Sequence, residues 1–338
     1  MDFEIQVGER LLGLGRPALL VAEIGGNHGG DPALAAALVR AAAAAGAGGI
    51  KFQAYRASSL ASRVSPYFKE LAAEELSFDH LAALLRLGRA LGLVTGLTVF
   101  DEAGLDLART AGVDFLKIAS GDLTHHRLLA RAAALGKPVF ISTGAGDETE
   151  VEAALAVLAP ERTVVLQCAA LYPAPPASAN LAVMAGWLAQ GLAAGYSDHA
   201  LGLAAARLAL ALGARVLEKH FTLVRTLPGG DNPLSATPEE FRRLADWAEE
   251  VRLLTGEGIK RLQPGEEAVR PLIRRAVLAA RNLPAGTRLA LEDLALKRPP
   301  VAGPALWGPE ALDMAVGRRL KRSLAEDEPL TGADLSDG

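Results

Sequence analysis

The stretch LVTGLTVFDEAGLDLARTAGVDFLKIASGDLTHHRLLARAAALGKPVFIS, residues 93–142, repeats one pattern three times. Short apolar, β-branched runs at Leu93–Val99, Phe115–Ile118 and Pro138–Ser142 alternate with alanine- and leucine-rich stretches of helical spacing. A glycine follows each helical stretch, as is common where a helix ends. Strands that alternate with helices predict βαβ units around a parallel sheet buried on both faces.

The same alternation extends along the chain in both directions. The further predicted strands are Leu19–Glu23, Gly49–Phe52, Thr163–Cys168, Ala193–Ser197 and Arg215–Lys219. The predicted helices are Pro32–Ala45, Phe78–Leu91, Glu102–Ala111, His126–Leu135, Glu148–Leu158, Leu181–Gln190, Leu201–Leu212 and Pro238–Leu254. Units in this number, over about 250 residues, predict a (β/α)8 TIM barrel. A doubly wound dinucleotide-binding fold is disfavoured because no G-x-G-x-x-G motif follows the first strand.

After Leu254 the alternation of strand and helix patterns ends and the sequence becomes charged and rich in turn residues. We expect a TIM-barrel domain over residues 1–258, a turn-rich charged linker over 259–273 and a small, mainly β domain over 274–338. A domain of that size without disulfides has marginal stability by itself, so we expect it to pack against the barrel or another subunit.

Composition excludes several classes of partner. The 338 residues carry a net charge of −4, without the basic stripe of a nucleic-acid binder. The apolar stretches are short and interrupted, so we expect no membrane partner. The single Cys168 fits a reducing compartment, and the first residues do not resemble a signal peptide. We therefore expect a cytoplasmic protein.

Polar and charged residues gather at the carboxyl ends of the predicted strands, where barrel enzymes carry their active sites. In chain order they are Glu23, Lys51, Gln53, Lys117, Ser120, Asp122, Ser142, Gln167, Tyr172, Ser197, His199, Glu218 and His220. Unpaired charges are costly to bury, so this set indicates an active site rather than a series of structural ion pairs.

The residue types indicate two kinds of chemistry. Lys51 and Lys117, with nearby serine hydroxyls, suit a phosphorylated anion. His199 and His220 end adjacent strands and suit a divalent cation, with Glu23 or Asp231 as oxygen donors. Spacing alone therefore predicts a metal-assisted barrel enzyme that acts on a phosphorylated, carboxylated small molecule. A Schiff-base aldolase and a non-catalytic carbohydrate-binding protein remain alternatives.

A series of motifs occurs in order along nearly the whole chain. They are AEIGGNH (22–28), KFQ (51–53), KIASGD (117–122), STG (142–144), YPAP (172–175), GYSDH (195–199), EKHFT (218–222), PGGD (228–231) and KRP (297–299). The set resembles the sialic acid synthase family, the N-acetylneuraminate synthases, which join a phosphoenolpyruvate-binding barrel to a C-terminal SAF (antifreeze-like) domain.

The resemblance implies a transferase that condenses phosphoenolpyruvate with an N-acetylated hexosamine such as N-acetylmannosamine and releases phosphate. The residues that match catalytic positions are Glu23, Lys51, Asp122 and His220. Those that match phosphoenolpyruvate contacts are Lys51, Gln53, Lys117, Ser120, Ser142 and Ser197. Those that match sugar contacts are Arg63, Tyr172, Asp231 and Arg298. His199 and His220 match the ligands of Mn²⁺ or Mg²⁺, and Arg298 would reach the partner's barrel in a domain-swapped homodimer.

This sequence departs from the family pattern at positions that bear on which sugar is the acceptor. Asp122 stands where glutamate is usual, and Arg63 stands where neuraminate-type enzymes carry asparagine. Ala170 replaces a polar residue, and Gln167 replaces a histidine. A di-N-acetylated sugar related to legionaminic or pseudaminic acid, or a spore-coat-type sugar, is therefore an alternative acceptor.

Overall fold

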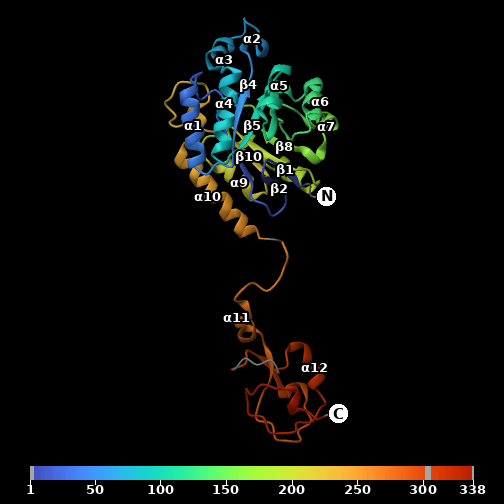
Figure 1. The fold of residues 1–338 in the computed structure, drawn as a ribbon. Helices are drawn as coiled ribbons and strands as arrows, with labels where there is room; N and C mark the ends of the chain where they lie inside the picture. The colour runs from blue at the N-terminus through green and yellow to red at the C-terminus, as the bar shows by residue number, and fades with distance from the viewer. Residues whose placement is uncertain (1–3, 257, 301–305, 337–338) are drawn as a thin grey trace. The chain divides into compact units, whose positions relative to one another are not determined.

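The computed structural model describes residues 4–256, 258–300 and 306–336. Its larger part is a closed barrel of parallel strands in the order β10-β3-β4-β5-β6-β7-β8-β9 (Figure 1). The strands are β3 (Leu19–Glu23), β4 (Gly49–Ala54), β5 (Val94–Val99), β6 (Phe115–Ile118), β7 (Val139–Ser142), β8 (Thr163–Cys168), β9 (Ala194–Asp198) and β10 (Val216–His220). The predicted (β/α)8 barrel is confirmed.

A helix follows each barrel strand. These helices are α1 (Pro32–Ala44), α4 (Phe78–Ala90), α5 (Glu102–Ala111), α6 (His126–Ala134), α7 (Glu148–Val157), α8 (Ala182–Ala189), α9 (Ala204–Ala211) and α10 (Pro238–Thr255). Several begin at side-chain caps readable in the sequence. The Asp31 carboxylate accepts a hydrogen bond from the Ala33 amide at 2.7 Å, with Pro32 in the first turn.

The connection between β4 and α4 contains two helices absent from the sequence prediction. These are α2 (Ala57–Leu60) and α3 (Phe68–Glu74). Figure 1 shows both at the end of the barrel opposite the N-terminal hairpin. A connection of this length in a compact domain is typical of a functional loop.

Alternation along the strands sorts the barrel interior into layers. Near the strand starts the interior is apolar, and the rings of Phe115 and Phe140 stack with centroids 4.2 Å apart. Two residues further along the same strands, the inward positions are Lys117 and Ser142. The period of two therefore carries each strand from the core into a polar layer at its carboxyl end.

An antiparallel hairpin of β1 (Ile5–Val7) and β2 (Arg10–Leu12) precedes the barrel. Its side chains Ile5, Val7 and Leu12 are fully buried in one cluster with apolar residues from the strand starts. The hairpin thus closes the end of the barrel away from the polar layer.

The chain divides into two compact units, Met1–Glu257 and Gly258–Gly338. The second contains α11 (Glu266–Ile273), α12 (Leu312–Ala315) and an antiparallel pair, β11 (Ala276–Ala279) and β12 (Leu294–Lys297). It has its own core, with Val277 and Leu330 fully buried. None of the helices in the described residues is long and apolar enough to span a membrane.

Short 3-10 helices complete the chain. They are η1 (Ser120–Asp122), η2 (Pro160–Arg162), η3 (Pro176–Ser178), η4 (Asn232–Leu234), η5 (Leu291–Asp293), η6 (Pro309–Ala311) and η7 (Gly332–Asp334). Two of them matter for the site, since η1 follows β6 and η4 lies in the connection after β10.

Candidate active site

A cavity of about 780 Å³ opens at the carboxyl ends of the barrel strands. The predicted site residues that line it are Glu23, Lys51, Gln53, Lys117, Ser120, Ser142, Tyr172, Ser197, His199, His220 and Asp231. They come from most of the barrel strands and the loops that follow them. The structure therefore brings most of the predicted set together in one place.

Two lysines on the cavity floor share one carboxylate. Glu218 Oε1 lies 3.7 Å from Lys51 Nζ and 3.8 Å from Lys117 Nζ. Lys51 also forms an ion pair with Glu23 and donates a hydrogen bond to Thr98 Oγ1 at 2.6 Å. Lys117 has fewer partners, and its Nζ donates to the Ile118 carbonyl at 3.1 Å.

This difference in partners separates the pKa values of the two buried lysines. Burial disfavours the charge on both. For Lys51, the Glu218 and Glu23 carboxylates outweigh burial, and the pKa lies above its ordinary value. For Lys117, attraction by Glu218 does not outweigh burial and the repulsion of Lys51, so its pKa is lowered. The charge of Lys117 is therefore balanced by fewer carboxylates than that of Lys51.

Glu23 is the floor group that can change its protonation near neutral pH. Burial raises the pKa of Glu23 to about 7, and the ion pair with Lys51 only partly offsets that effect. The Gln53 amide lies 3.5 Å from Glu23 Oε1. Glu218, which faces both lysines, has instead a pKa below its ordinary value despite burial.

Hydroxyl groups surround the lysines. Ser120 Oγ accepts a hydrogen bond from the Gly144 amide at 3.0 Å, and Ser197 Oγ donates to Glu218 Oε1 at 3.2 Å. A Cβ at Gly144 would lie 2.9 Å from both Ser120 Oγ and the Ala170 amide nitrogen, which explains the glycine of the S-T-G motif. Ser142 Oγ is buried and has no hydrogen-bond partner in the described chain.

Unpartnered buried polar atoms concentrate in this cavity. Apart from Glu23 Oε2, which pairs with Lys51, the buried side-chain atoms of described cavity residues without a hydrogen-bond partner belong to Ser142, Glu218 and His220. Buried polar groups in native proteins are nearly always satisfied. This concentration therefore indicates a place for a polar ligand.

The two predicted metal-ligand histidines lie side by side. The imidazole centroids of His199 and His220 are 5.3 Å apart. Burial lowers the pKa of His199 to about 4 and that of His220 to about 3, so both rings are neutral at pH 7 and each has one unprotonated ring nitrogen. Asp231 Oδ2 lies 3.3 Å from His220 Nδ1, although the two atoms are not aligned for a hydrogen bond.

This arrangement fits a divalent cation that takes two nitrogen ligands from the protein. The orphaned Nδ1 of buried His220 and the lone pair of neutral His199 supply the donors. The described residues contain no cluster of three or more side chains able to hold a metal ion. Water or substrate oxygen atoms would therefore complete the coordination.

The cavity rim contains lining residues that sequence reasoning missed. Leu60 of α2, and Tyr67, Glu70, Leu71 and Glu74 of the α3 segment, line the cavity with the strand-end residues. Glu70 and Glu74 are one helical turn apart, and the connection that carries them is unusually long. Those two signals are readable in the sequence.

Three predicted site residues do not line this cavity. Asp122 is half-buried in η1, with its carboxylate 3.4 Å from His125 Nδ1, and Arg63 is exposed between α2 and α3. Arg298 is an exposed residue directly after β12 in the second unit. Gln167, one of the departures from the family pattern, donates to the Ala179 carbonyl at 3.1 Å instead.

A separate group of polar residues holds the loops at this end of the barrel. Lys219 and Asp198 form a buried ion pair at 2.8 Å, and Lys219 also donates to the Ala200 carbonyl. Asn27 donates to the Phe221 carbonyl and to Ser235 Oγ, both at 2.8 Å. These residues fix the loops after β3, β9 and β10.

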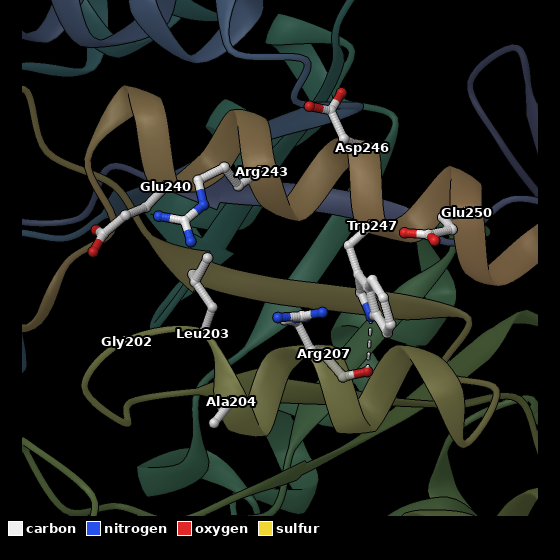
Figure 2. A pocket seen from close by; sticks show the side chains of 9 residues that line it. All are labelled: Gly202, Leu203, Ala204, Arg207, Glu240, Arg243, Asp246, Trp247 and Glu250. Atoms are coloured by element: carbon white, nitrogen blue, oxygen red, sulfur yellow. Dashed lines mark hydrogen bonds between the residues drawn. The ribbon is translucent and has the colours of Figure 1, made fainter.

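Figure 2 shows a second cavity, of about 550 Å³, between α9 and α10. The Arg207 guanidinium lies 4.0 Å from the ring centroid of Trp247, whose indole donates to the Arg207 carbonyl at 3.3 Å. The remaining charged residues there are Glu240, Arg243, Asp246 and Glu250. This lining has neither a histidine nor a lysine and lies outside the barrel, so it is not the centre of the chemistry.

Comparison with known proteins finds one family for the barrel and several similar sugar-acid synthases. Residues 38–260 match the model of the NeuB family, and residues 274–336 match the SAF domain. The chain is 35% identical to the N,N'-diacetyllegionaminic acid synthase of Legionella pneumophila, covering 90% of this chain and 91% of that protein. It is 30% identical to the N-acetylneuraminate-9-phosphate synthase of Mus musculus, covering 97% and 95%.

A solved structure of a similar protein agrees with these sequence relatives. The N-acetylneuraminic acid (sialic acid) synthetase of Leptospira borgpetersenii, crystallised with citrate, superposes with a TM-score of 0.76 at 33% identity, covering 80% of this chain and 96% of that one. The resemblance drawn from the motifs is confirmed, and the chain belongs to the NeuB family, with a SAF domain after its barrel.

Proposed function

We propose that this enzyme condenses phosphoenolpyruvate with an N-acetylated hexosamine to give a nonulosonic acid and phosphate. The observation that carries the proposal is the floor of the cavity, where buried Lys117 shares one carboxylate with Lys51 and the Ser142 hydroxyl of the same lining has no partner. An anion with phosphate and carboxylate groups satisfies both. The names of the relatives support the same class of reaction.

Each floor residue has a part in holding phosphoenolpyruvate. Lys51 and Lys117 face its negative charges, and Ser120, Ser142 and Ser197 offer hydroxyl groups to its oxygen atoms. Gln53 has its amide at the Glu23 side of the same floor. The bound anion raises the pKa of Lys117, because it supplies the counter-charge that burial requires.

The reaction balances without an oxidant or reductant. C3 of phosphoenolpyruvate forms a bond to the aldehyde carbon, whose oxygen gains a proton. Water adds at C2 and loses a proton, and the C2–O bond to phosphate then breaks. Glu23, with a pKa of about 7, can accept the proton that this water loses.

His199, His220 and Asp231 form the part of the site that would hold a cation. When bound there, a divalent cation such as Mn²⁺ or Mg²⁺ supplies Lewis-acid polarisation of the aldehyde oxygen. The neutral state of both imidazoles at pH 7 keeps their lone pairs available for it. Tyr172, stacked on His199, lies where it can contact the acceptor.

The proposal also gives the SAF domain a part in binding the acceptor. We propose a barrel domain at 1–258, a linker at 259–273 and a SAF domain at 274–338, in a domain-swapped homodimer. Arg298 is exposed and follows β12 directly, so its guanidinium is free to contact an acceptor in a partner's barrel. Asp122 and Arg63 remain proposed catalytic and sugar contacts that would have to approach the acceptor when it binds. We propose a cytoplasmic location for the enzyme.

The identity of the acceptor has several candidates within one class. N-acetylmannosamine, a di-N-acetylated sugar of the legionaminic or pseudaminic type, and a spore-coat-type sugar all carry the N-acetylated, aldehyde-bearing frame. A phosphate-release assay with phosphoenolpyruvate, Mn²⁺ and a panel of these acceptors tests the proposal. Phosphate and a new sugar acid by mass spectrometry are expected with at least one acceptor, and release with none contradicts the proposal.

A Schiff-base aldolase is the second candidate, because the lowered pKa of Lys117 makes its amine a better nucleophile than an ordinary lysine. Lys51 does not fit this role, since two carboxylates keep it charged. Borohydride treatment with pyruvate distinguishes the two reactions. Covalent trapping on Lys117 supports the aldolase, and absence of trapping with phosphate release supports the synthase.

A further inference from the structure

A buried ion pair lies beside the two predicted metal-ligand histidines. Asp198 is the last residue of β9 and directly precedes His199, and Lys219 directly precedes His220 at the end of β10. Lys219 Nζ lies 2.8 Å from Asp198 Oδ2, and the two side chains are 1% and 0% exposed. Neither residue lines the cavity, so neither side chain touches a substrate bound there.

The ion pair and the histidines lie on opposite faces of the barrel wall. His199 and His220 line the cavity. Because side chains alternate along a strand, Asp198 and Lys219 face outward, into the layer between the strands and the helices. Tyr196, two residues before Asp198, packs in the apolar cluster of that layer. Each histidine is therefore the immediate chain neighbour of one member of the pair.

The contacts of the pair enclose the backbone of His199. Asp198 Oδ1 accepts a hydrogen bond from the Ala200 amide at 2.9 Å. Lys219 Nζ donates to the Ala200 carbonyl at 2.7 Å. The residues on both sides of His199 are therefore tied to one buried pair, and Lys219 joins them to β10.

The same contacts extend the link between the two strands to the level of the histidines. Asp198 and Lys219 are the last register partners of β9 and β10. His199 lies one residue beyond the end of β9, where side-chain bonds to Ala200 take the place of the strand ladder. The pair thus connects the strands at the point where the two imidazole centroids are 5.3 Å apart.

The two imidazoles differ in how they are held. His199 Nδ1 lies 2.8 Å from the Ala169 carbonyl oxygen, which orients that ring. The buried Nδ1 of His220 has no hydrogen-bond partner, so the position of its ring depends on the backbone of β10. Ligands of one ion need to be held within about 0.5 Å of their working geometry. The link that Lys219 makes from β10 to β9 meets this need.

A buried ion pair is a costly way to fill space between strands and helices. Both charges lose their hydration, and apolar residues of similar volume often give equal or greater stability. Stability alone therefore does not account for a charged pair at this position. An orienting role does, because the pair makes directional bonds to both backbone groups of Ala200.

We propose that Asp198 and Lys219 are positioning residues of the cation site: their buried pair fixes the separation of the two imidazole rings before a cation binds. This inference rests on the proposed cation site at His199 and His220. The pair acts through Ala200 and the β10 backbone and touches neither the ion nor the substrates. Loss of groups that orient metal ligands lowers metal affinity by about 10- to 100-fold.

The test measures Mn²⁺ binding to the full chain by titration calorimetry without substrates. Asp198→Asn combined with Lys219→Met nearly conserves the two volumes and leaves no buried charge. The Kd of this double variant for Mn²⁺ should rise about 10- to 100-fold. Its Kd for phosphoenolpyruvate, measured without a cation, should change by less than about threefold, because Lys51 and Lys117 on other strands hold that anion. Turnover lost at low Mn²⁺ should return as the Mn²⁺ concentration is raised.

Asp114→Asn is the matched control. The Asp114 carboxylate accepts hydrogen bonds from the Thr95 amide at 2.8 Å and the Thr95 hydroxyl at 3.0 Å. It therefore also joins neighbouring strands, but at the starts of β5 and β6, away from the histidines. Asp114→Asn should lower the midpoint of urea unfolding and leave the Kd for Mn²⁺ unchanged. This control separates a general loss of stability from a loss of positioning.

An unchanged Kd for Mn²⁺ in the double variant, or an equal loss of affinity in Asp114→Asn, overturns the positioning role while the cation site stands. If the double variant does not fold, Asp198→Glu takes its place. That substitution keeps both charges but moves the carboxylate by one methylene, and the same outcomes decide. A wild type that binds neither Mn²⁺ nor Mg²⁺ instead overturns the proposed cation site itself. The two failures are therefore distinguishable.

Discussion

The phenol ring of Tyr172 stacks on the imidazole of His199 with centroids 4.1 Å apart, and its hydroxyl lies 3.0 Å from Nε2. Nδ1 of the same imidazole lies 2.8 Å from the Ala169 carbonyl oxygen and therefore carries the proton. The tyrosine hydroxyl donates to the remaining lone pair of Nε2. That lone pair is the one a cation would use.

Replacement of Tyr172 by phenylalanine should raise the affinity for Mn²⁺. A cation at His199 Nε2 must displace the hydrogen bond from the Tyr172 hydroxyl. Without that hydrogen bond in the free protein, the Kd for Mn²⁺ should be about 2- to 10-fold lower. Titration calorimetry without substrates measures the change. His199→Ala should abolish binding in the same experiment. Weaker binding in Tyr172→Phe would mean that the hydroxyl is itself a ligand.

Removal of the Lys117 charge should weaken phosphoenolpyruvate binding strongly. Lys117→Ala deletes a charge-assisted contact and leaves Glu218 with one counter-charge fewer, so the Kd should rise about 100-fold. Exposed Lys260→Ala is the control and should bind as the wild type does. Equilibrium binding of phosphoenolpyruvate checks both. A change below threefold in Lys117→Ala would place the anion elsewhere.

Two glutamates should titrate near neutral pH. Burial raises the pKa of both Glu23 and Glu74 to about 7, far above that of an exposed glutamate. Carboxyl ¹³C NMR of glutamate-labelled protein should show two side-chain signals that titrate near pH 7. Glu23→Gln and Glu74→Gln should each remove one of them. If all glutamate signals titrate below pH 5, the proton-accepting role of Glu23 is wrong.

Each buried histidine should make a contribution to the stability of the metal-free protein that is lost in acid. Burial holds the pKa of His199 at about 4 and that of His220 at about 3 in the folded protein, against about 6.5 in the unfolded chain. Below pH 6.5 the unfolded chain therefore binds protons that the folded protein does not. Each histidine therefore lowers the free energy of unfolding by about 1.4 kcal/mol per pH unit as pH falls from 6.5 to 4. The raised pKa values of Glu23 and Glu74 act in the opposite direction over much of this range, so each histidine's contribution is read from the difference between wild type and variant.

Urea unfolding in EDTA at several pH values measures this slope. His220→Asn should reduce it, and His126→Asn, at an exposed histidine, should not. Equal slopes in the wild type and both variants would show that the two imidazoles are not held neutral by burial.

Subunit mixing tests the proposed action of Arg298 in a partner's barrel. His220→Ala inactivates the barrel and Arg298→Ala the SAF domain. If the SAF domain acts in trans, each mixed dimer has one intact site, and an equal mixture should recover about a quarter of wild-type activity. If it acts within its own chain, the mixture should stay as inactive as either variant alone.

The barrel and its strand-end residues were predictable because two regular patterns determine them. One is the alternation of strands and helices along the chain, and the other is the two-residue alternation of side chains along each strand. Alternation on β6 carries Phe115 into the core and Lys117 into the polar layer, and the closed barrel brings the strand ends together. The sequence therefore predicted His199 and His220 as neighbours without knowledge of any distance.

The rim was not predictable in the same way. The position of α3 depends on close packing against Gly26 and Gly30, far away in the sequence, and helix propensity does not report such contacts. The same reason applies to Asp122, which the motif places after a barrel strand but whose carboxylate is near His125 instead of in the cavity lining. Local pattern fixes which strand carries a residue, whereas the turn that follows decides where its side chain points.

Condensation of phosphoenolpyruvate at the floor of the barrel is tested most directly through the bridging oxygen of that substrate. Phosphoenolpyruvate with ¹⁸O between C2 and phosphorus is incubated with Mn²⁺ and the acceptor panel, and both products are analysed by mass spectrometry. We expect ¹⁸O in the released phosphate and a sugar acid that contains the acceptor and the three carbons of pyruvate. Label retained in the organic product, or no phosphate with any acceptor, would contradict it.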